Sequence, residues 1–168
     1  MGVNLVLIGP PGAGKSSIGR ALSKALEVPF TDTDSKIEAT AGKKISDIFL
    51  EDGEPKFREI EKKIVLDEIT NLNGVLALGG GSVLDGDVSE ELQKMKDKVI
   101  YLEVSISNAA PRVGFNKDRP LLAVNPRQQW LSLMEKRRPI YEKLAGLKIL
   151  TDNKKPSEVV KEIQEFLK

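Results

Sequence analysis

Residues Gly9-Pro10-Pro11-Gly12-Ala13-Gly14-Lys15-Ser16 decide the fold class, because they match the pattern G-x-x-x-x-G-K-[ST]. The motif follows a short apolar run at residues 3–8, which is typical of a strand buried on both faces. Apolar residues at helical spacing come after it, namely Ile18, Ala21, Leu22, Ala25 and Leu26. A glycine loop between a strand and a helix is the setting in which this motif binds phosphate groups.

Each residue type in the loop has a physical role. Glycines let successive backbone N–H groups point at one anion, and the following helix adds the positive end of its dipole. We expect the loop to bind a nucleoside triphosphate, and ATP is the expected one. Lys15 should reach its β- and γ-phosphates, and the Ser16 hydroxyl should bind Mg²⁺. The loop residues predicted to bind the nucleotide are Gly12, Ala13, Gly14, Lys15, Ser16 and Ser17.

The composition indicates one globular domain of 168 residues, with 40% apolar and 30% charged residues. The net charge is only +1, which argues against a nucleic-acid or membrane-surface partner. Residues 112–143 nevertheless contain eight Lys or Arg against three Asp or Glu, which suits a small, multiply charged anion. A monomer is the default expectation.

Several chemistries are excluded because the chain has no cysteine and no histidine. This excludes disulfides, thiolate chemistry, imidazole catalysis and most zinc sites. Any proton transfer must therefore use a carboxylate, a lysine or a tyrosine. No signal peptide is visible, and no apolar run approaches the roughly 18 residues of a membrane span, so a cytoplasmic location is expected.

Strand and helix patterns alternate along the whole chain, which predicts an α/β fold with a parallel sheet. Residues 28–34 read as a second strand, on which Asp32 and Asp34 face the same side at the carboxyl end. The two aspartates could belong to a solvated turn or cap a helix that starts near Ser35. Alternatively, Asp32 could hold the metal through water and Asp34 could accept a proton from an attacking hydroxyl.

A helical region at residues 35–51, broken near Gly42, precedes a longer helix that ends near Leu72. Arg58 and Glu61 lie on one stripe of this second helix. They could form a surface pair worth about 0.2 to 0.5 kcal/mol. In the alternative interpretation, Glu61 orients Arg58 so that its planar fork meets a ligand carboxylate.

A third strand at residues 74–78 runs into Gly79-Gly80-Gly81. Ordering three glycines is entropically unfavourable, so the run is either a flexible loop or a place where the backbone approaches a ligand closely. The strand carries no terminal aspartate of the Walker B type, so Asp32 must take more of that role.

After a fourth strand at residues 98–103, we expect a charged lid at residues 114–124. Within it, Asn116-Lys117-Asp118-Arg119 is close to the guanine-reading N-K-x-D, but its fourth residue is Arg, which argues against GTP. Arg119 could be a solvated loop residue or the arginine that reaches the transferring phosphoryl group.

The helix after Pro126 places Arg137, rather than its charged neighbours, on the inward stripe. Arg137 could instead extend from that stripe to solvent. We expect Pro139 to break or kink this helix. A fifth strand at residues 148–150 and a final helix at residues 156–167 follow, with Val159, Val160, Ile163, Phe166 and Leu167 facing inward.

Taken together, the motifs resemble those of the shikimate kinase family, and they occur in family order over nearly the whole chain. They are G-P-P-G-A-G-K-S at 9–16, D-T-D at 32–34, F-R-x-x-E at 57–61, G-G-G at 79–81, R-P-L-L at 119–122 and K-R-x-P-x-Y at 136–141. The glycine loop alone is shared by a vast superfamily, whereas the later motifs are much more selective.

The resemblance implies a three-layer P-loop fold of the nucleoside monophosphate kinase type, with a five-stranded parallel sheet in the order 2-3-1-4-5 and a small mobile lid. It implies transfer of the ATP γ-phosphate to the 3-hydroxyl of shikimate, a step toward aromatic amino acids, with an acceptor-binding helical region at residues 33–61. Carried over by position, the acceptor residues would be Asp34, Arg58, Gly79, Gly80, Gly81 and Arg137.

The same resemblance implies that Lys15 and Arg119 stabilise charge on the transferring group, and that Ser16 and Asp32 place Mg²⁺. Arg112 and the loop from Lys154 to Pro156 match the adenine-packing positions, and Lys154 stands where members often carry arginine. Two rival interpretations stay open: another small-molecule kinase, acting on gluconate or a nucleoside monophosphate, and a nucleotide-binding regulatory module without chemistry.

Overall fold

Five parallel strands form the centre of the molecule in the computed structural model, which describes residues 3–113 and 126–168. The strands are β1 (Leu5–Ile8), β2 (Phe30–Asp32), β3 (Val75–Ala77), β4 (Val99–Glu103) and β5 (Leu147–Leu150). They lie in the order β2-β3-β1-β4-β5, and every neighbouring pair is parallel. The predicted α/β class and strand order are therefore confirmed.

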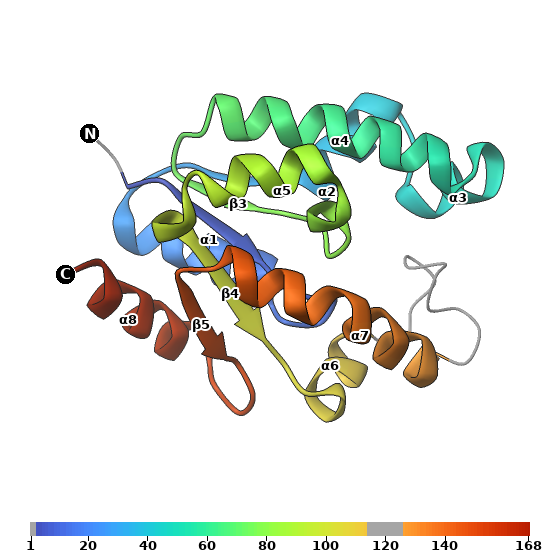
Figure 1. Cartoon of the computed structure of the whole chain (residues 1–168). Coiled ribbons are helices and arrows are strands. Elements are labelled where there is room, and N and C mark those ends of the chain that lie inside the picture. The colour runs from blue at the N-terminus through green and yellow to red at the C-terminus, as the bar shows by residue number, and fades with distance from the viewer. Residues whose placement is uncertain (1–2, 114–125) are drawn as a thin grey trace.

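Helices cover both faces of this sheet (Figure 1). They are α1 (Lys15–Leu26), α2 (Thr33–Ala41), α3 (Ile45–Asp52), α4 (Glu54–Thr70), α5 (Gly86–Gln93), α6 (Ile106–Val113), α7 (Pro126–Leu144) and α8 (Pro156–Leu167), with short 3₁₀ turns η1 (Ser82–Leu84) and η2 (Lys96–Lys98). Helices α1 and α8 pack together on one face, and α5 and α7 pack together on the other. The result is a three-layer arrangement.

Strand β1 lies at the centre of the sheet, and all four of its residues are buried there. Its neighbours are β3, where Leu5 is opposite Val75, and β4, where Val6 is opposite Val99. Burial on both faces explains why this strand is continuously apolar instead of alternating. The glycine loop that follows β1 consequently lies at the middle of the carboxyl edge of the sheet, where open α/β folds bind ligands.

The helical region predicted for acceptor binding has a small core of its own. Buried Ile37, Ile45, Ile48 and Phe57 join α2, α3 and α4 into this second cluster. The predicted break near Gly42 is confirmed, since Gly42 ends α2 with φ 72°. This packing gives α4 a fixed place beside the sheet, as Figure 1 shows.

The predicted position of Asp34 on a strand is wrong. Strand β2 ends at Asp32, and α2 begins at Thr33, so Asp34 belongs to the first helical turn. The cause is local, because the Asp32 side chain caps the helix by accepting a hydrogen bond from the N–H of Asp34 at 2.9 Å. The cap interpretation of Asp32 is thus correct, although it does not exclude the ligand role.

Two expectations for the last third of the chain also need correction. Of the break or kink predicted at Pro139, the break does not occur, because helix α7 continues past the proline to Leu144. Buried Tyr141 and Leu144 anchor the turn beyond the proline, and this packing outweighs one missing hydrogen bond. Phe166 and Leu167 are exposed rather than inward, because that end of α8 points away from the sheet (Figure 1).

The segment predicted as a lid, residues 114–124, lies outside the described residues. Among the helices that are described, none combines the length and the apolar character needed to cross a membrane.

Candidate active site

The glycine loop takes a backbone shape that its glycines make possible. Gly9, Gly12 and Gly14 all have positive φ, which other residues rarely adopt. At Gly12 an added Cβ would also lie 3.0 Å from Ala109 of α6. The Lys15 ammonium group donates to the carbonyls of Gly9 at 2.7 Å and Pro10 at 3.0 Å. The loop and the start of α1 thus form a cradle across which Lys15 lies.

A cavity of about 260 Å³ opens at this loop. Its lining includes Gly12, Gly14, Lys15, Ser16 and Ser17, together with Pro11, Asp32, Asp34, Ala77 and Leu78. The fold therefore brings the predicted phosphate-binding residues and both aspartates to one hollow. Ala13, in contrast, is buried, so only its backbone can serve a ligand there.

The residues predicted to place a metal are in direct contact. The Ser16 hydroxyl donates to a carboxylate oxygen of Asp32 at 2.5 Å. No group of three or more metal-ligating side chains occurs within residues 3–113 and 126–168. One hydroxyl and one carboxylate fit Mg²⁺, because this ion usually keeps several waters and takes further oxygens from phosphates.

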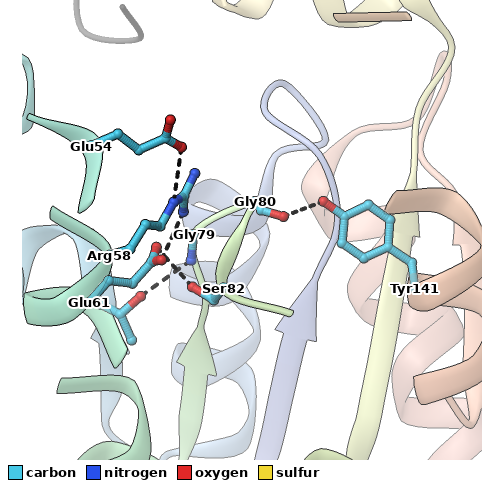
Figure 2. Close-up of polar contacts among 8 residues, drawn as sticks. Glu54, Arg58, Glu61, Gly79, Gly80, Ser82 and Tyr141 are labelled. Atoms are coloured by element: carbon cyan, nitrogen blue, oxygen red, sulfur yellow. Dashed lines mark hydrogen bonds and ion pairs between the residues drawn. The ribbon is translucent and has the colours of Figure 1, made fainter. Parts of the chain in front are cut away.

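Arg58 is held in place by carboxylates of its own helix. Nη1 of Arg58 donates to Glu61 at 2.8 Å, and Nε donates to Glu54 at 3.3 Å. Glu61 also accepts a hydrogen bond from Ser82 at 3.1 Å, and the residue is only 4% exposed. Figure 2 shows the Arg58 side chain reaching from α4 toward the loop that follows β3. The Arg58–Glu61 pair is therefore partly buried, and the simple surface-pair interpretation is wrong.

Burial raises the pKa of the Glu61 carboxyl, and the nearby Asp34 adds to the rise, whereas Arg58 and Ser82 oppose it. A buried carboxylate is stable here only while its hydrogen-bond donors stay in place. Glu61 consequently fixes the position of Arg58 more firmly than an exposed partner would.

The three consecutive glycines are the point where the candidate acceptor residues meet. A Cβ on Gly79 would lie 2.7 Å from Oδ1 of Asp34, and one on Gly81 would lie 2.6 Å from Nη1 of Arg58. A Cβ on Gly80 would lie 3.0 Å from Nη1 of Arg137 and 3.0 Å from Cδ of Pro11. The glycines are needed because functional side chains and the phosphate loop occupy the space of their missing side chains.

The run is also ordered, which excludes the flexible-loop interpretation. All three glycines are buried. The N–H of Gly79 donates to the Thr33 hydroxyl at 3.3 Å, and the carbonyl of Gly80 accepts from the Tyr141 hydroxyl at 2.5 Å.

Arg137 is the buried cation of the site, at 4% exposed. Within residues 3–113 and 126–168, its buried Nε has no hydrogen-bond partner. Burial lowers the pKa of this guanidinium, Tyr141 opposes the change, and the positive charge of Arg58 lowers it further. Two neighbouring guanidinium groups that repel each other make a natural receptor for an anion. The alternative in which Arg137 extends to solvent is wrong.

Two residues of α7 contact the site although neither was predicted to belong to it. The buried Trp130 indole donates to the carbonyl of Pro11 in the glycine loop at 3.1 Å. Tyr141, which is the last residue of the K-R-x-P-x-Y motif, donates to Gly80 as described above. The helical spacing that predicts an inward Arg137 also predicts that Trp130 and Tyr141 face inward. No pattern in the sequence indicates that they donate to the carbonyls of Pro11 and Gly80.

The positions expected around adenine lie on adjacent segments. Helix α6, which includes Arg112, packs against the glycine loop through Ala109. The loop after β5 joins the start of α6, since the N–H of Ser105 donates to Asp152 at 3.0 Å. In that loop Lys154 pairs with Glu162 at 2.8 Å, and Pro156 begins α8. The side chain of Arg112 and all of Arg119 lie outside the described residues.

Fold and site together place the chain in the class of P-loop kinases that act on small molecules. Comparisons with known proteins narrow this class. The family model for shikimate kinase matches residues 11–168. The chain therefore belongs to the shikimate kinase family.

Individual relatives agree with this assignment. The chain is 46% identical over 164 residues to a shikimate kinase of Rhodococcus jostii (strain RHA1), covering 97% of this chain and 96% of the relative. It is 49% identical over 156 residues to a shikimate kinase of Rhodococcus erythropolis (strain PR4 / NBRC 100887), covering 92% and 91%. The solved shikimate kinase from Acinetobacter baumannii in complex with shikimate superposes with a TM-score of 0.91 at 31% identity, over 98% of this chain and 93% of that one.

Proposed function

We propose that this chain transfers the γ-phosphoryl group of ATP to the 3-hydroxyl of shikimate, giving shikimate 3-phosphate and ADP, in the biosynthesis of aromatic amino acids. The observation that carries the proposal is the convergence of Asp34, Arg58 and Arg137 on the three glycines next to the phosphate loop. A carboxylate with several hydroxyls is the ligand that two guanidinium groups and one carboxylate would recognise.

In the proposed step, an oxygen lone pair of the 3-hydroxyl forms a bond to the γ-phosphorus while the bond from that phosphorus to the β–γ bridging oxygen breaks. Asp34 accepts the hydroxyl proton, so the phosphate ester and ADP are the products. Lys15 stabilises the negative charge on the transferring group. Arg119 is proposed for the same role on the basis of the family motif alone.

Arg58 and Arg137 would bind the shikimate carboxylate, and the N–H groups of the glycine run would complete the acceptor site. Ser16 and Asp32 would hold Mg²⁺, which when bound supplies positive charge beside the phosphates. Arg112, Lys154 and Pro156 would pack around adenine, since α6 and the loop after β5 are joined beside the glycine loop.

We also propose that the protein works as a monomer in the cytoplasm. One chain supplies both the phosphate loop and the described acceptor residues, so the site needs no second copy. ATP and a biosynthetic acceptor would both be available to the enzyme in that compartment.

The experiment that tests the proposed reaction presents purified protein and Mg-ATP with shikimate, gluconate or AMP in separate assays and measures ADP release. We expect ADP release with shikimate, above the rate without any acceptor, and the background rate with the other two. Release with gluconate or AMP but not with shikimate would overturn the proposal. Nucleotide binding without release in any assay would favour the regulatory module.

A further inference from the structure

The peptide between Gly80 and Gly81 is held from the side of α7 by one hydroxyl group. Tyr141 is fully buried, and its hydroxyl donates to the Gly80 carbonyl at 2.5 Å. Figure 2 shows Tyr141 approaching the glycine run from the side opposite to Arg58 and Glu61. The contact joins positions 61 residues apart, so it ties α7 to the loop after β3.

The orientation of this carbonyl fixes the orientation of the next N–H group. The peptide is trans, so the N–H of Gly81 points away from the Gly80 carbonyl and from Tyr141. Figure 2 shows Arg58 on the side of the glycine run opposite to Tyr141, so this N–H is directed to the side on which Arg58 lies. Among the described residues, the N–H groups of Gly80 and Gly81 donate to no other backbone group.

Tyr141 also lies next to the buried cation of the site. It is one helical turn from Arg137, and its polar group opposes the effect of burial on that guanidinium. Its ring packs against Tyr101 of β4 with the centroids 5.0 Å apart, which gives the side chain a fixed position. The hydroxyl is therefore aimed by a ring of fixed position, and it lies beside both the Gly80 carbonyl and the Arg137 guanidinium.

We infer that Tyr141 is a positioning residue for the acceptor: its hydroxyl holds the Gly80 carbonyl so that the N–H of Gly81 and the guanidinium of Arg137 face one anionic hydroxy acid. The inference deepens the proposed function and rests on it. Tyr141 itself touches neither reacting group. Tyr141 therefore strengthens the binding of the acceptor and does not affect the binding of ATP.

The chain offers a matched pair of variants, because it has only two tyrosines and both are buried in the same ring contact. Tyr141→Phe removes the hydroxyl that holds Gly80 and keeps the ring. Tyr101→Phe removes the buried hydroxyl of the other ring, whose charged neighbours are Glu103, Arg138 and Glu142. We expect Tyr141→Phe to raise the KM for shikimate about 10-fold and to leave the KM for ATP unchanged. Tyr101→Phe should have the same KM values as the parent.

An unchanged KM for shikimate, an equal rise in both KM values, or the same rise in Tyr101→Phe would overturn the inference. The parent's own turnover with shikimate is measured alongside, so failure of the proposed function shows separately as a parent that releases no ADP. Thermal melting of each variant reports whether it is folded.

A second measurement covers the case in which Tyr141→Phe does not fold. In the Tyr101→Phe background Tyr141 is the only tyrosine, and 3-fluorotyrosine incorporated there keeps the hydroxyl. We expect its ¹⁹F resonance to shift on addition of shikimate and to stay in place on addition of ADP. A ¹⁹F chemical shift that does not change on addition of shikimate would overturn the inference.

Discussion

Arg137 and Gly80 are in such close contact that a methyl group on Gly80 would lie 3.0 Å from Nη1 of the arginine. The same methyl group would lie 3.0 Å from Cδ of Pro11 in the phosphate loop. Gly80 therefore lies between Arg137, which is proposed to bind the acceptor anion, and the glycine loop, which is proposed to bind phosphate, and it contacts both closely. This contact gives the first prediction.

Gly80→Ala should raise the KM for shikimate by about 10-fold or more, because the added methyl displaces either Arg137 or the glycine loop. Steady-state kinetics with shikimate and ATP varied in turn measure the effect. Gly86→Ala is the matched control, since nothing lies within 4 Å of a Cβ at that position. Parent-like kinetics in Gly80→Ala would contradict the described packing.

Arg137→Lys should lower kcat/KM for shikimate by about 100-fold, because an ammonium group cannot reproduce the planar fork of a buried guanidinium. Arg138→Lys makes the same chemical change at an exposed neighbour and should leave the kinetics near those of the parent. Equal losses in the two variants would mean that the helix, rather than the site, responds to the substitution.

Asp34→Asn should lower kcat by about 100- to 10,000-fold, because the amide accepts no proton from the shikimate hydroxyl. The Kd of ATP, measured by calorimetry without the acceptor, should stay close to the parent value. Asp67→Asn, on the exposed side of α4, serves as the control for loss of a carboxylate. Turnover of Asp34→Asn at the parent rate would remove Asp34 from the proposed role.

Glu61→Gln tests the buried carboxylate through the pH dependence of stability. Burial raises the pKa of Glu61 in the folded state above its ordinary 4.5, so the folded chain binds the proton more tightly than the unfolded chain. The contribution of Glu61 to stability is then greatest below pH 4.5 and falls as the pH rises through the raised pKa.

The free energy of unfolding of the parent, relative to Glu61→Gln, should therefore decrease as the pH rises above 4.5, the ordinary pKa of a glutamate. Urea titrations at several pH values measure this difference. Glu59→Gln controls for removal of one carboxylate from an exposed position of the same helix. A difference that rises with pH would show that pairing with Arg58 dominates over burial.

The sequence predicted the elements best where burial dictates residue type. The apolar runs that became β1, β3 and β4 are buried on both faces, and the helix spacing correctly placed Arg137 on an inward stripe. Strand order came from the family resemblance, because no local pattern states which strands pair. Helix α8 was predicted with its observed bounds, because Pro156 marks its first turn and its apolar residues follow at helical spacing.

Elsewhere, tertiary packing or capping overrode the local signals. Residues 28–34 were predicted as a strand through Asp34, yet the Asp32 cap starts the helix two residues earlier than expected. Pro139 signals a break, but the buried residues beyond it keep α7 intact. The roles of Trp130 and Tyr141 depend on backbone carbonyls distant in the chain, which are invisible in a single sequence.

The most direct test of the shared acceptor site compares shikimate with its methyl ester, which keeps the hydroxyls and lacks the negative charge. If Arg137 binds the carboxylate, kcat/KM in the parent should favour the acid by about 100-fold, and Arg137→Ala should lose most of that preference. An equal preference for the acid in the parent and in Arg137→Ala would contradict the account.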